Sequence, residues 1–260
     1  MTAAIGIPLI LAVTWLGAWW FAVACGVIAL LASIEFGHGW LFPSLPISRA
    51  APQLTTFSLP AVMVTGAHED TRFIGAGLVF ALLTAGAGYL PIKAVGPRKP
   101  WRVLAWCIVY IGIGVASLVL IRDLGEGREW FLLALLPVFA VDTGAYATGR
   151  AIGRHKLAPR ISPKKTWEGA IGGYVAGVVA FLVANSLLST GQGAATMAPF
   201  ALAMPILAQA GDLLESGMKR RMGVKDASGL LPGHGGFMDR LDSIVLVAPA
   251  FYVFLRLAVL

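Results

Sequence analysis

Long apolar stretches alternate with short polar segments along the whole chain. A helix needs about 20 mostly apolar residues to cross a bilayer. The first stretch, residues 4–36, is too long for one untilted helix, and Gly17 with the Trp19-Trp20 pair predicts a break into two short helices. The pattern predicts spans at 4–36, 54–67, 73–92, 103–121, 130–149, 167–188, 196–215 and 237–260. We therefore expect an all-α polytopic integral membrane protein with about nine transmembrane helices, or eight if the first two are one.

Composition and charge agree with a membrane protein. Apolar residues make up 58% of the chain and the mean hydropathy is +0.80, beyond the range of soluble globular domains. The net charge of +7 would suit a nucleic-acid ligand, but 15 of the 20 basic residues lie in the alternate loops 37–53, 93–102, 150–166 and 216–236. We expect no nucleic-acid partner. The positive-inside rule predicts that these loops are cytoplasmic, with the C-terminus outside if there are nine helices.

The most polar window, residues 211–243, holds five acids and five bases in a chain that is only 13% charged. Asp212 and Glu215 are three residues apart, as are Asp239 and Asp242, and residues at this spacing share one face of a helix. Carboxylates that converge without His or Cys partners indicate a hard divalent cation such as Mg²⁺, bound together with substrate phosphates. The alternative is a solvated loop whose charges only anchor two membrane helices.

Bases and glycines lie between these acid pairs. Lys and Arg supply positive charge, and glycine lets backbone N–H groups approach phosphate oxygens closely. His234 lies within the turn Pro232–Gly236, where it either donates to a phosphate or holds the turn. The bases and the turn therefore suit a phosphate ligand.

Asp142 lies inside an otherwise apolar predicted span, about two turns from its basic end. A carboxylate at such a position is costly, so it is by default functional or paired. The alternative is a structural partner for an arginine. In the next span, Gly169, Gly173 and Gly177 form a ridge of small residues, which predicts close helix packing and no chemistry.

The basic segment 153–169 contains two possible helix starts. Ser162 followed by Pro163 suits an N-cap and first helical position, whereas Thr166 suits the cap of a helix that begins at Trp167. In either case the helix N-terminus lies beside two lysines and forms an anion site. The alternative is that the lysines only fix the orientation in the membrane.

Three sequence blocks contain a distinctive order of polar residues. The main block contains Ser216, Lys219-Arg220, Lys225-Asp226, Pro232-Gly233-His234-Gly235-Gly236, Asp239-Arg240 and Asp242. The others are Asp142-Thr143-Gly144-Ala145-Tyr146 and the segment from Ser162 to Gly169, preceded by His155-Lys156-Leu157-Ala158-Pro159. In order and spacing these blocks resemble the phosphatidate cytidylyltransferase (CDP-diacylglycerol synthase) family. The resemblance covers residues 140–243, while residues 1–139 match only in being apolar. It implies a catalytic region at 140–260 and packing, lipid-facing helices at 1–139.

The resemblance implies that CTP and phosphatidic acid give CDP-diacylglycerol and pyrophosphate at a bacterial cell membrane, on its cytoplasmic side, in a homodimer. It implies a catalytic set of Asp212, Asp239, Lys219, Arg240 and Asp142. Mg²⁺ would be held by Asp212 and Asp239, with Glu215 and Asp242 as further ligands or supporting groups, and a second cation is left open. Substrate would be bound by Lys164, Lys165, Ser216, Arg220, Lys225, Asp226, His234, Gly235 and Gly236.

Two other functions fit part of the pattern. One is a CTP-dependent enzyme that acts on another lipid, such as an ether lipid or a polyprenol. The other is a transporter, whose binding site would lie near the bilayer midplane, often between internal repeats. Here the charges gather at one edge of the spans and no convincing repeat is present, which favours the enzyme.

Overall fold

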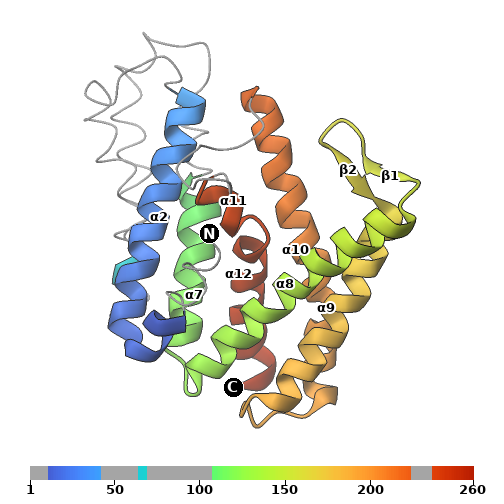
Figure 1. The fold of residues 1–260 in the computed structure, drawn as a ribbon. Helices are drawn as coiled ribbons and strands as arrows, with labels where there is room; N and C mark the ends of the chain where they lie inside the picture. The colour runs from blue at the N-terminus through green and yellow to red at the C-terminus, as the bar shows by residue number, and fades with distance from the viewer. Residues whose placement is uncertain (1–10, 42–63, 69–106, 224–235) are drawn as a thin grey trace. The chain divides into compact units, whose positions relative to one another are not determined.

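The computed structural model describes residues 11–41, 64–68, 107–223 and 236–260 (Figure 1). Four helices in these residues are long and apolar enough to cross a membrane, so the polytopic membrane architecture is confirmed. The count of nine stays a prediction, because most of the predicted spans 54–67 and 73–92 lies outside the described residues. The chain forms two compact units: Met1–Asp123 with Asp226–Arg240, and Leu124–Lys225 with Leu241–Leu260.

The first unit begins with the predicted break. Residues 11–16 are helical, Gly17 has a φ of +126°, and helix α2 follows at Ala18–Leu41. Such a φ favours glycine, because a Cβ would clash with the backbone. The predicted loop 37–53 starts later than expected, since α2 continues past Glu35 to Leu41. The first proline after Glu35 is Pro43, and a proline disfavours helical conformation in the residue before it. No proline therefore ends α2 before Leu41.

The predicted span at 103–121 also belongs to the first unit. It consists of the π-helix η2, Cys107–Ile113, and the helix α7, Gly114–Arg122, both of which pack against α2. Residues 114–121 of α7 are all buried. At the end of α7 the Arg122 guanidinium donates to the Thr14 carbonyl oxygen at 3.0 Å, which ties α7 to the helical turn before Gly17.

The second unit is built on the close pair of helices α8, Gly127–Ile152, and α9, Trp167–Leu187. A Cβ added to Gly173 would lie 2.7 Å from the Val141 carbonyl oxygen, and one on Gly169 would lie 2.8 Å from the Ala145 carbonyl oxygen. Only glycine fits at such an approach of two backbones. The predicted ridge of small residues is therefore confirmed as a packing surface.

A β-hairpin joins α8 to α9 (Figure 1). Its strands, β1 Lys156–Ala158 and β2 Ser162–Thr166, are antiparallel. Thr166 caps α9, because its Oγ1 accepts the N–H of Gly169 at 3.2 Å, as one predicted alternative requires. The other alternative, a helix that starts at Ser162 and Pro163, is wrong, since both residues lie in β2. A proline lacks a donor and is tolerated in an edge strand such as β2.

Helix α10 spans Ala194–Met222, seven residues beyond the predicted end at 215. Ser216, Lys219 and Arg220 therefore lie on a helix and not in a loop. The helix ends at Gly223, whose φ of +80° suits a glycine C-cap. The predicted final span at 237–260 is broken by a turn at Asp242 and Ser243. It consists of the short helix α11, Met238–Leu241, the apolar helix α12, Ile244–Phe254, and the π-helix η3, Leu255–Val259.

Aromatic rings from four helices fill the core of the second unit. Phe251 of α12 is fully buried. Its ring centroid lies 4.7 Å from that of Phe200, 6.1 Å from that of Phe181 and 6.2 Å from that of Trp130. Large buried rings dominate core energetics, and their tilted and edge-on contacts add to the area they bury. This cluster holds α8, α9, α10 and α12 together.

Candidate active site

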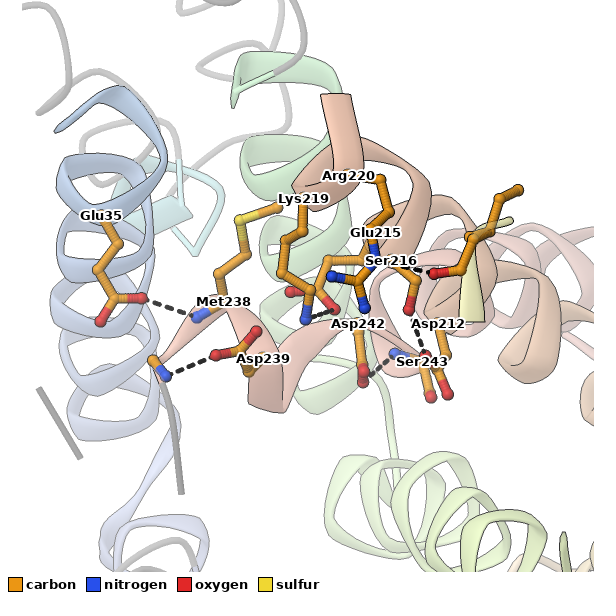
Figure 2. Close-up of polar contacts among 12 residues, drawn as sticks. Glu35, Asp212, Glu215, Ser216, Lys219, Arg220, Met238, Asp239, Asp242 and Ser243 are labelled. Atoms are coloured by element: carbon orange, nitrogen blue, oxygen red, sulfur yellow. Dashed lines mark hydrogen bonds and ion pairs between the residues drawn. The ribbon is translucent and has the colours of Figure 1, made fainter. Parts of the chain in front are cut away.

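The C-terminal half of α10 carries acids and bases at helical spacing. Lys219 Nζ lies 3.2 Å from Glu215 Oε2, one turn apart, and the Ser216 hydroxyl donates to Asp212 Oδ1 at 3.3 Å (Figure 2). The Glu215 side chain is fully buried and the Lys219 side chain is 13% exposed. Removing one partner of a buried ion pair is destabilising, because it leaves a buried charge without compensation. The charged residues in the C-terminal half of α10 are therefore part of the packed structure.

The hairpin brings a second lysine to these acids. Lys165 of β2 forms an ion pair with Asp212. Arg220 Nε also donates to the carbonyl oxygen of Ile161, next to the hairpin turn, at 3.0 Å. Two side-chain contacts therefore fasten the hairpin to α10. They bring together residues that belong to separate predicted blocks, as a shared phosphate site requires.

Asp242 joins this group through a close approach of backbones. A Cβ on Gly211 would overlap the carbonyl oxygen of Asp242, so only glycine allows α10 to reach the turn before α12. Burial raises the pKa of the Asp242 carboxyl, and the negative charges of Asp212 and Asp142 raise it further. The Ser243 N–H, which donates to Asp242 Oδ1 at 2.7 Å, acts in the opposite direction. Negative charge is therefore concentrated here.

A carboxylate that was not predicted as a site residue holds the base of the hairpin. Glu168 in the first turn of α9 accepts the backbone N–H groups of Arg154 and His155 at 3.1 and 3.2 Å. Its other oxygen lies 2.5 Å from Nδ1 of His155. An acid at a helix N-terminus is favoured by the helix dipole. Two sequence signals point to Glu168: its position in the first turn and its place in the block from Ser162 to Gly169.

The first unit contains another group of acids, around the start of α11. Glu35 Oε2 accepts the Met238 N–H at 3.1 Å, and Asp239 Oδ2 accepts the Gly236 N–H at 2.7 Å (Figure 2). Glu35 is 3% exposed and Asp239 is 9% exposed. Asp239 thus lies in the first turn of its helix as predicted, whereas no prediction covers the role of Glu35.

The remaining predicted site residues either are exposed or differ from the prediction in position. Lys164 on β2, Asp142 on α8 and Arg240 on α11 are exposed. Asp212 lies inside α10 and does not end a helix, because the charged turns after it continue the helix to Met222. Its convergence with Asp239 stays a prediction, since the two residues belong to different compact units. Four predicted residues lie outside the described residues: Lys225, Asp226, His234 and Gly235.

The acids of α10 and its neighbours have the chemistry of a hard-cation site. The atoms that they offer as metal ligands are all carboxylate oxygens, which Mg²⁺ prefers over nitrogen and sulfur. Within the described ranges, no three His, Cys, Asp or Glu side chains lie close enough together to hold a metal ion. The described side chains therefore offer oxygen donors and like charges without a complete ligand set.

Comparison with known proteins identifies the family. The profile described as "Cytidylyltransferase family" matches residues 1–258. The chain belongs to this family. A phosphatidate cytidylyltransferase of Brucella suis biovar 1 is 36% identical over 238 residues, which cover 90% of this chain and 87% of the relative. A phosphatidate cytidylyltransferase of Staphylococcus saprophyticus is 42% identical over 148 residues, which cover 57% of this chain and 56% of the relative. The match includes the N-terminal helices, where the sequence blocks gave no resemblance beyond apolar character.

Proposed function

We propose that this membrane protein is a CTP:phosphatidate cytidylyltransferase that makes CDP-diacylglycerol and pyrophosphate. Membership of the cytidylyltransferase family supports the reaction class, and the relatives named phosphatidate cytidylyltransferase support the lipid substrate. The observation that carries the proposal is the group formed by Lys165, Asp212, Glu215 and Lys219. It places two lysines beside carboxylates at the polar end of an apolar helix, where a nucleotide and a lipid headgroup can meet.

In this reaction an oxygen of the lipid phosphate attacks the α-phosphorus of CTP. The bond from that phosphorus to the bridging oxygen breaks, and pyrophosphate leaves with the electron pair. Two anions must be brought together, so positioning and positive charge matter more than proton transfer. Lys165 and Lys219 supply charge from a strand and a helix that the fold holds together. No covalent nucleophile is needed, which leaves Ser216 as a binding or capping hydroxyl.

We assign the metal site to the acids of the predicted set. Asp212 and Asp239 are the leading ligands, with Glu215 and Asp242 as further ligands or supporting groups. A bound Mg²⁺ would neutralise phosphate charge and orient the triphosphate. The negative charges of Asp212 and Asp142, which help to raise the pKa of Asp242, support this assignment, because a bound cation would offset their repulsion. A second cation remains an open part of the proposal.

The remaining substrate contacts follow the family blocks. We assign the binding of the phosphates and the lipid headgroup to Lys164, Lys165, Ser216, Arg220, Lys225, Asp226, His234, Gly235 and Gly236.

The uneven distribution of lysine and arginine among the loops supports an active site on the cytoplasmic side of a bacterial cell membrane. Cysteines placed at residues 164 and 228 should then be protected from an impermeant reagent in intact cells. Labelling of both from outside would contradict this orientation. A homodimer belongs to the proposal as well.

The function is tested with the purified chain in detergent, labelled CTP and a panel of lipid acceptors. We expect CDP-diacylglycerol to form with phosphatidic acid, and no product with diacylglycerol, which lacks the attacking phosphate. A preference for a polyprenol phosphate or an ether-lipid phosphate would favour the related enzyme class. CTP turnover that needs no lipid phosphate, or solute flux that needs no CTP, would contradict the proposal.

A further inference from the structure

Glu35 is a buried acid for which the reaction described above has no use. It lies in α2, a helix of apolar character, and only 3% of its surface is exposed. A buried carboxylate in a membrane helix is costly unless hydrogen bonds satisfy it. The described contacts of Glu35 lead to a segment about 200 residues later in the chain, at the entry to α11.

At that entry, two carboxylates each accept one backbone N–H. Glu35 Oε2 accepts the Met238 N–H at 3.1 Å, while Asp239 Oδ2 accepts the Gly236 N–H at 2.7 Å (Figure 2). A Cβ on Gly236 would lie 2.9 Å from Cδ of Glu35 and closer still to Oε2. Glycine at this position therefore leaves the space that the Glu35 carboxylate occupies.

This arrangement matters because α11 is only four residues long. An isolated helix of one turn is unstable, since nucleation fixes several residues for a single hydrogen bond. Contacts from elsewhere in the fold must therefore set its conformation. The acid in its first turn, Asp239, reaches back to the Gly236 N–H in the manner of a capping box. Glu35 accepts the N–H of Met238, two residues after Gly236.

We propose that Glu35 is a positioning residue for the cytidylyl transfer. By holding the backbone at Gly236 and Met238, it sets the direction in which Asp239 presents its carboxylate. This inference rests on the proposed function, in which Asp239 is a metal ligand. It adds a residue from the N-terminal helices to a site that the sequence blocks confine to residues 140–243.

The test compares two replacements of equal length. Glu35→Gln keeps an oxygen that can accept the Met238 N–H, whereas Glu35→Met keeps the volume and loses the acceptor. The matched control is Ser33→Ala, because Ser33 is buried on the same helix and its hydroxyl has no hydrogen-bond partner among the described residues. We expect kcat to fall about tenfold to a hundredfold in Glu35→Met, since a misplacement of about 1 Å can cost about a hundredfold. Glu35→Gln should restore most of the rate, and Ser33→Ala should match the wild type.

Two readouts separate positioning from general damage. In Glu35→Met, the Mg²⁺ concentration for half-maximal activity should rise, whereas partial unfolding would lower the amplitude and leave that midpoint unchanged. Hydrogen exchange in metal-free protein should accelerate in peptides that cover residues 236–241 and not in α7. Exchange and a Mg²⁺ midpoint equal to those of the wild type in folded Glu35→Met would overturn the proposal. If the wild type turns over no lipid phosphate, the proposed function fails, and the exchange result still shows whether Glu35 holds this turn.

A compensating pair covers the case in which Glu35→Met does not fold. Gly236→Ala places a methyl group against the Glu35 carboxylate and should lower kcat. Glu35→Asp withdraws that carboxylate by one methylene, so the double variant should be more active than Gly236→Ala alone by about threefold or more. Equal activity of the single and double variants would show that the carboxylate and the glycine do not act together.

Discussion

The described contacts of the acids on α10 differ from those of the acids around α11. Glu215 and Asp212 form ion pairs with the flexible side chains of Lys219 and Lys165. Glu35 and Asp239 accept backbone N–H groups instead. A lysine can turn from a carboxylate to an incoming phosphate by rotating its side chain, whereas a backbone N–H leaves its acceptor only if the chain moves. The first group is suited to exchanging partners, and the second to holding geometry.

Charge removal at one acid of each group gives the largest expected effect. Asp212→Asn and Asp239→Asn keep the shape of the side chain and delete its charge. We expect each to lower turnover by at least about two orders of magnitude, the scale of losing one electrostatic contact in a transition state. Activity should vanish in EDTA and return with Mg²⁺. The measurement is CTP-dependent formation of CDP-diacylglycerol by folded protein.

These two variants also sharpen the comparison. Because a neutral amide oxygen accepts a hydrogen bond more weakly than a carboxylate, Asp239→Asn should accelerate hydrogen exchange at residues 236–238 slightly. Asp239→Ala, which removes the oxygen that accepts the Gly236 N–H, should accelerate it more. Asp212→Asn should leave that segment unchanged. Near-normal rates in both variants would remove the metal assignment, and the acids would then be structural partners of the neighbouring bases.

The buried ion pair of α10 gives the next largest effect, on stability. Lys219→Met removes a charged partner of the buried Glu215, and breaking a buried ion pair in this way typically costs about 3–5 kcal/mol. Thermal unfolding in detergent should show a clear loss, and Glu215→Leu added to Lys219→Met should recover much of it. The matched control is Lys164→Met, since Lys164 is exposed. A double variant less stable than Lys219→Met would contradict this account of the pair.

Packing of the second unit supplies a smaller effect. Gly173→Ala brings a methyl group to 2.7 Å from the Val141 carbonyl oxygen and should cost about 1–3 kcal/mol through overpacking. Gly125→Ala is the control, because a Cβ there meets no atom within 4 Å. Thermal unfolding of both variants decides the matter. Equal melting temperatures would show that α8 and α9 can move apart to accommodate the methyl group at little cost in stability.

The smallest effect is expected at Ser216. Its hydroxyl donates one hydrogen bond of 3.3 Å to Asp212, and such a bond contributes about 0.5–1.5 kcal/mol. Ser216→Ala should therefore lower activity by roughly tenfold or less. A loss as large as that of Asp212→Asn would mean that the hydroxyl takes part in the chemistry.

Local signals in the sequence predict those features whose causes are local. The break at Gly17, the cap at Thr166 and the glycine packing of α9 each depend on the conformation or volume of a single residue. The β-hairpin lacks such a signal, because β2 is a short run of polar residues without alternation. The extension of α10 to Met222 is missed for a related reason: charged residues lower the hydropathy but do not end a helix.

The candidate site shows the same division. Carboxylate spacing and the family blocks predict the acids and bases of α10, and the structure brings Lys165 to Asp212 from a separate block. No local pattern connects Glu35 with Met238, because they are 203 residues apart and their contact is made to a backbone N–H. A hydrogen bond to the backbone leaves no trace in the identity of the residue that donates it.

Gly211 carries a consequence for reading the effects of mutations. It has no side chain, yet a Cβ there would overlap the carbonyl oxygen of Asp242 and push α10 away from the turn before α12. In a scan of every substitution at every position, we expect residue 211 to tolerate no replacement, with a profile as severe as that of its neighbour Asp212. Intolerance alone would then not distinguish a residue that handles the substrate from one that only lets two segments of backbone touch.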